Sequence, residues 1–130
     1  MTARDAERKP KGLTAAAASH GIVSDGEGSW PLWLFELVDD LRKRRDAELI
    51  VEPPAPGLGV RMRALVASTV EPLCAELHLP VPEWCWETAA LAEPWFVAGL
   101  EDLKVMALVE SPVWFRRRNV FVLGNFLSRA

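Results

Sequence analysis

Apolar residues recur at helical spacing in two long stretches of the chain. Over residues 30–45 they alternate at intervals of three and one, which places them on one stripe of a helix: Trp30, Trp33, Leu34, Leu37, Val38 and Leu41. Ser29 can cap this helix, and Pro31 suits its first turn. A second stripe covers residues 58–78 and keeps its phase across Pro72. We therefore expect one helix there, with a kink on its solvent side.

Shorter apolar patterns predict further helices over residues 83–92, 100–110 and 112–117. The connector over residues 47–51 and the β-branched and aromatic run over residues 120–122 leave room for one short strand pair. Proline-rich breaks separate these elements. The predicted fold is thus a mainly α domain of four to five helices with proline-rich connectors.

The first residues of the chain follow a different pattern. Residues 1–28 combine mixed charges, a run of alanines and several glycines, so they offer little apolar surface to bury. Within them, only residues 13–20 could form a short, marginal helix. We expect a flexible N-terminal tail over residues 1–28 and one helical domain over residues 29–130.

The composition is that of a folded chain rather than a disordered one. Half of the residues are hydrophobic, and six tryptophans are present without a tyrosine. No apolar run is long enough for a membrane span, and the first residues lack the apolar region of a signal peptide. Two cysteines, Cys74 and Cys85, do not make a disulfide framework. We expect a cytoplasmic protein that does not enter a membrane.

Charge is divided along the chain. Residues 71–102 contain seven acids and no lysine or arginine, whereas residues 111–130 contain four arginines and no acid. Such a division indicates either complementarity within the chain or a charged partner. We expect the arginines of residues 116–118 to pair with acids of residues 71–102.

No pattern typical of catalysis or cofactor binding is present. Cys74 and His78 are four residues apart and could reach one ion together with Cys85, but a structural zinc site needs a fourth ligand. Cys74 also lies on an apolar stripe, where a thiol behaves as a small hydrophobe. A nucleophilic Cys85 would need an oxyanion loop and an orienting group, and neither is recognisable. We expect no catalytic residue, metal, cofactor or small-molecule substrate, and hence a protein that is not an enzyme.

Two sets of residues could meet a partner. The first is acidic and aromatic, and predicts binding to a basic protein surface: Glu83, Trp84, Trp86, Glu87, Trp95 and Phe96. The second is aromatic and basic, and could hold phosphates and stack bases as a nucleic-acid-binding regulator: Trp114, Arg116, Arg117 and Arg118. A net charge of −3 favours the protein partner. The alternative to a partner-binding role is that all six tryptophans lie in the core.

Two motifs in the C-terminal third resemble the C-terminal part of small bacterial proteins encoded beside nucleotidyltransferase-like toxins of two-gene toxin–antitoxin modules. They are Pro94-Trp95-Phe96 and the later run Ser111-Pro112 followed by Phe115-Arg116-Arg117-Arg118-Asn119-Val120-Phe121-Val122. The resemblance implies an antitoxin-like role, in which the acidic aromatic set masks a basic RNA- or nucleotide-binding surface of the toxin. Earlier parts of the chain do not add to it, and it implies no functional residue outside the two motifs.

Overall fold

The computed structural model describes residues 12–99 and 101–129, which form a mainly helical domain and confirm the predicted fold class. These residues contain seven α-helical segments: α2 (Ala15–Asp25), α3 (Trp30–Arg44), α4 (Glu48–Val51), α5 (Val60–Leu77), α6 (Glu83–Glu87), α7 (Glu101–Glu110) and α8 (Val113–Arg116). Two 3-10 turns, η1 (Glu27–Ser29) and η2 (Phe126–Arg129), and two strands, β1 (Trp95–Phe96) and β2 (Val120–Phe121), complete the order. The helix count exceeds the prediction because α2 and several one-turn helices add to it.

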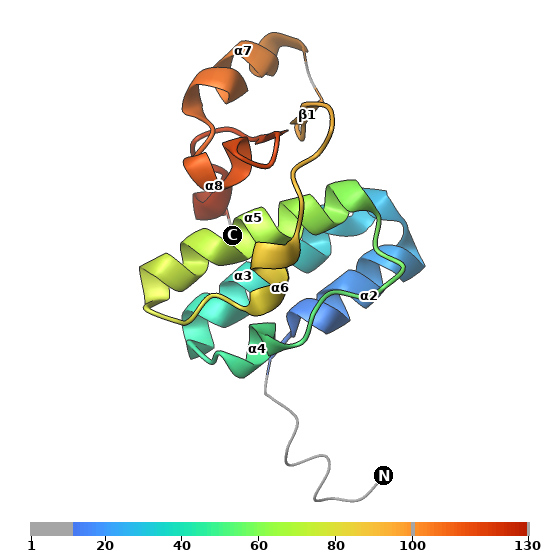
Figure 1. Ribbon diagram of the computed structural model, residues 1–130, viewed down its shortest axis with the longest axis vertical. Coiled ribbons are helices and arrows are strands. Elements are labelled where there is room, and N and C mark those ends of the chain that lie inside the picture. The colour runs from blue at the N-terminus through green and yellow to red at the C-terminus, as the bar shows by residue number, and fades with distance from the viewer. Residues whose placement is uncertain (1–11, 100, 130) are drawn as a thin grey trace, which may run out of the picture.

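Helix α5 is the centre of the fold. It contacts α3, α6, α8 and β2, so that elements cover it on several sides (Figure 1). All side chains from Ala64 to Cys74 are buried, which is expected for a helix surrounded by protein. The helix continues through Pro72 as predicted, but Pro72 is buried, so the expectation of a solvent-facing proline was wrong.

The first described helix corrects the predicted domain boundary. Helix α2 packs on α3, and Ala15, Ala18 and Ile22 belong to the main core. Its small residues permit this close packing, because a methyl group added at Gly21 would overlap the Trp33 ring. The flexible tail predicted over residues 1–28 therefore does not include α2, and residues 1–11 lie outside the described part.

A short parallel sheet joins the segment after α6 to the C-terminal segment. Trp95 pairs with Val120 and Phe96 with Phe121, which places the predicted strand over residues 120–122 in a ladder. Its partner is β1 rather than residues 47–51, which contain helix α4 instead. Helix α6 also ends at Glu87, five residues before the predicted end.

The C-terminal segment closes the core. The Phe126 ring lies 5.4 to 5.8 Å from the rings of Trp30, Phe35 and Phe115, measured between centroids. The Arg42 guanidinium donates to the carbonyl of Leu127 at 2.8 Å. These contacts fasten the end of the chain to α3, far from it in sequence.

Candidate protein-binding surface

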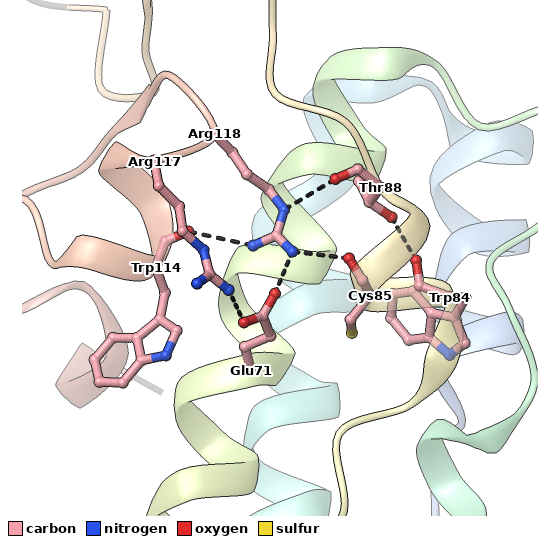
Figure 2. A network of polar contacts seen from close by, with 7 residues as sticks. All are labelled: Glu71, Trp84, Cys85, Thr88, Trp114, Arg117 and Arg118. Carbon is pink, nitrogen blue, oxygen red and sulfur yellow. Dashed lines mark hydrogen bonds and ion pairs between the residues drawn. The ribbon is translucent and has the colours of Figure 1, made fainter.

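The arginine at the centre of the C-terminal motif is buried. Arg118 donates to the carboxylate of Glu71 and to the carbonyl of Cys85 at 2.8 Å (Figure 2). Its other nitrogens donate to the carbonyls of Trp114 at 3.3 Å and Thr88 at 3.4 Å. A buried guanidinium needs its donors satisfied and its charge paired, and this network does both. Arg118 therefore joins the C-terminal segment to α5 and α6.

The neighbouring arginines also have partners within the chain. Arg117 pairs with the second carboxylate oxygen of Glu71, which confirms the predicted pairing with an acid of residues 71–102 for Arg117 and Arg118. Arg116 instead donates to the last carbonyls of α7, those of Leu108 at 2.8 Å and Val109 at 3.2 Å. A cation at this position compensates the negative end of the helix dipole. All three guanidinium groups thus serve the fold, and Trp114, the fourth residue of the basic set, is half-buried.

Three aromatic residues of the acidic set are held inside the molecule. The Trp84 indole is buried, and its N–H donates to the carbonyl of Ile50 at 2.8 Å. Trp95 is half-buried with the Arg61 guanidinium 5.4 Å from its ring centroid. Phe96 is half-buried and stacks on Phe121, with the ring centroids 5.2 Å apart. These side chains take part in the packing of the fold, Trp84 fully and Trp95 and Phe96 in part.

The other three residues of that set share the exposed face of α6. Glu83, Trp86 and Glu87 are spaced i, i+3 and i+4, which places them side by side on a helix. The Trp86 side chain is 64% exposed, and both glutamates are exposed. Within the described residues, neither glutamate has an ion-pair partner. We call Glu83, Trp86 and Glu87 the α6 surface.

The Arg117 side chain borders the α6 surface. The Arg117 guanidinium carbon lies 6.0 Å from the centroid of the Trp86 ring, at the outer limit of a cation–π contact. Arg117 shares the single carboxylate of Glu71 with Arg118, so this cluster keeps one net positive charge beside the α6 surface. The α6 surface therefore combines one large apolar ring with two carboxylates that have no ion pair among the described residues, and the partly exposed Arg117 borders it.

A groove of about 800 Å³ opens beside the α6 surface. Glu83, Trp84 and Glu87 form one wall, residues 88–92 continue it, and the remaining wall comes from α4, α5 and their connector: Val51, Pro53, Val60 and Arg63. We call it the α6 groove. Its volume is typical of ligand and peptide sites, which measure roughly 300–1,000 Å³. No local sequence pattern places α4 and residues 88–92 together, because these segments meet only in the fold.

The cysteines and His78 do not come together as metal ligands. Cys74 and Cys85 are buried free thiols, whereas His78 is exposed at the end of α5. Burial raises the pKa of the Cys74 thiol to about 11, and the negative charge of Glu71 adds to the effect. Burial likewise raises the pKa of Cys85. Among the described residues, no group of three or more histidines, cysteines or acids is placed to hold a metal ion.

No protein-family model, curated protein or solved structure matches the chain. The resemblance of the two C-terminal motifs to toxin-associated proteins therefore stays a prediction. In the part of the chain that the structure describes, no helix has both the length and the apolar character needed to cross a membrane.

Proposed function

We propose that the protein is a non-enzymatic protein-binding module that meets its partner through the α6 surface. The observation that carries the proposal is Trp86, 64% exposed between two carboxylates that lack an ion pair among the described residues. Burying the exposed part of an indole against a partner contributes on the order of 3 kcal/mol. Tryptophans placed in this way are frequent energetic hot spots of interfaces.

The partner that fits this surface is a protein with a basic face. Glu83 and Glu87 supply negative charge at the rim of the contact, where complementary charge speeds association and selects the partner. The resemblance of the C-terminal motifs points to one class of basic partner, a nucleotidyltransferase-like toxin. Covering its RNA- or nucleotide-binding surface would give this protein an antitoxin-like action by steric and electrostatic masking.

The nucleic-acid-binding alternative has less support from the contacts. Of its basic residues, Arg118 is buried against Glu71 and Arg116 caps α7. Arg117 keeps part of its side chain in solvent, but it is held by the carboxylate of Glu71, which it shares with Arg118. A phosphate would have to compete with these internal acceptors.

Co-expression with the product of the adjacent gene tests the proposal. The tagged protein is purified and its elution volume is compared for the wild type, Trp86→Ala and the charge-reversal pair Glu83→Lys/Glu87→Lys. The matched control, Glu36→Lys/Asp39→Lys, reverses two exposed acids on α3. The wild type and the control should elute with the partner, whereas both α6 variants should elute alone. Elution of the wild type alone, or retention of the partner by the α6 variants, would overturn the proposal.

A further inference from the structure

The segment that follows α6 forms backbone hydrogen bonds to the C-terminal segment along one of its edges. Along its other edge, the backbone groups of Ala90 have no partner among the described residues. It rises from α6 toward β1 as an extended trace (Figure 1). The Leu91 N–H donates to the Arg118 carbonyl at 2.9 Å, and the Leu91 carbonyl accepts from the Asn119 side-chain amide at 3.0 Å. Successive residues of an extended chain direct their backbone groups to opposite sides. The N–H and carbonyl of Ala90 therefore face away from the C-terminal segment, and no described residue bonds to them.

The α6 groove lies along this segment and has apolar walls. Val51 and Val60 are exposed in it, and the Trp84 ring contributes to the same lining. Arg63 also lines the groove, but its guanidinium donates to the carbonyls of Leu58 at 3.0 Å and Ala55 at 2.6 Å. The Nε and Nη2 groups of Arg63 are thus engaged by the connector before α5, while its charge has no ion pair among the described residues; with Glu83 and Glu87 the lining keeps a net negative charge.

Two kinds of polar group remain free at the groove. The carboxylates of Glu83 and Glu87 lie in its lining without an ion pair among the described residues, and Ala90 offers an unpaired backbone donor and acceptor. A small organic cation would satisfy only the carboxylates. An extended peptide with a basic side chain would satisfy the carboxylates and pair with the backbone, in the manner of strand addition.

We infer that the α6 groove binds an extended peptide segment carrying an apolar residue next to an arginine or lysine. The apolar side chain lies between Val51 and Val60, the cation meets Glu83 and Glu87, and the peptide backbone pairs with Ala90. The inference rests on the proposed function and deepens it, because it names the conformation and chemistry of the partner's binding segment.

A titration followed by ¹⁵N–¹H NMR of the full chain tests the charge requirement. The probes are acetyl-Ala-Leu-Arg-Leu-Arg-Ala-amide, the same peptide with glutamate at both arginine positions, and arginine amide as a small cation. The basic peptide should shift the amide signals of residues 83–92 and saturate. The double variant Glu83→Gln/Glu87→Gln should weaken its binding about tenfold, the effect of two partly solvated ion pairs. The matched variant Glu36→Gln/Asp39→Asn should leave it unchanged.

Two proline variants test the backbone pairing. Ala90→Pro removes the N–H that the inference pairs with the peptide and should abolish binding, because a peptide strand loses its donor. Ala89→Pro adds the same ring one residue earlier and should retain binding, since Thr88 already has the extended backbone that a following proline requires (φ −79°, ψ 114°). The spectrum of each variant shows whether it is folded.

Four results would overturn the inference: no saturable shift with the basic peptide at millimolar concentration, equal binding of the acidic peptide, equal binding of arginine amide, or equal effects of the two prolines. The titration needs no natural partner. Its failure would therefore overturn the groove inference alone, whereas failure of co-elution would overturn the proposed function.

Discussion

Replacing Glu71 by glutamine should destabilise the protein far more than the same change at Glu76. Both residues lie in α5, and both accept from arginine, so the chemical change is identical. Glu71 is 3% exposed and gives one carboxylate oxygen to Arg117 and the other to Arg118. Glu76 is 45% exposed and pairs with Arg42 at 3.0 Å on the surface.

Because the two environments differ, Glu71→Gln and Glu76→Gln should lower the free energy of unfolding by different amounts. Removing one partner of a buried ion pair costs about 3–5 kcal/mol, because it leaves the other charge buried without compensation. The lower end applies here, since the Arg117 side chain is 44% exposed and water can solvate it, while Arg118 stays buried. We expect Glu71→Gln to cost about 3 kcal/mol and Glu76→Gln to cost less than about 1 kcal/mol.

Urea unfolding followed by circular dichroism at equilibrium measures both values, and a thermal scan should show the Glu71→Gln midpoint about 10 °C below the wild type. Added salt should change the effect at Glu76 more than the effect at Glu71, because exposed pairs are screened and buried ones are not. Costs within about 0.5 kcal/mol of each other would refute the structural role assigned to the Glu71 network.

The remaining predictions concern packing, capping and pH. Gly21→Ala should destabilise the fold by about 1–3 kcal/mol in urea unfolding because its methyl group meets the Trp33 ring, whereas Gly28→Ala, with open space around it, should be nearly neutral. Arg116→Ala should cost about 1 kcal/mol and speed hydrogen exchange in α7, whose last carbonyls lose their cation. The Cys74 pKa is about 11 in the fold against 9.0 for a free thiol, so the unfolded thiol ionises first. The wild type should therefore lose stability relative to Cys74→Ala as pH rises from 9 toward 11, and a parallel response of the two would contradict this.

Sequence pattern was sufficient for the long helices and failed where burial depends on small residues. Helices α3 and α5 were predicted within two residues because each has a long apolar stripe. Helix α2 buries Ala15, Ala18 and Ser19, and such a face has almost no hydrophobic contrast with a linker. Its core position depends on the close fit of Gly21 under Trp33, which no local pattern encodes.

The end of α6 was missed for a different reason. Residues 88–92 have fair helix propensity, but the Leu91 backbone bonds to Arg118 and Asn119, and such tertiary contacts override a weak local preference. Because residues 88–92 are extended rather than helical, they line the α6 groove. The groove could not be predicted, because its walls come from segments that meet only in the fold.

The candidate surface was predictable in part. A spacing of two residues places Trp84 and Trp86 on roughly opposite sides of a helix, but the spacing alone does not tell which of them faces the core. Trp95 and Phe96 were included in the acidic and aromatic set because they lie among acids in the sequence. In the fold, Trp95 lies next to Arg61 and Phe96 next to Phe121. Long-range partners of this kind have no trace in the local sequence.

Hydrogen exchange of the complex with its protein partner tests the central claim most directly. The α6 surface and groove predict that exchange slows in residues 83–92 on binding, while α2 and the outer face of α3 stay unchanged. Slower exchange confined to residues 113–121, with residues 83–92 unaffected, would contradict the account and place the interface on the aromatic and basic C-terminal motif instead.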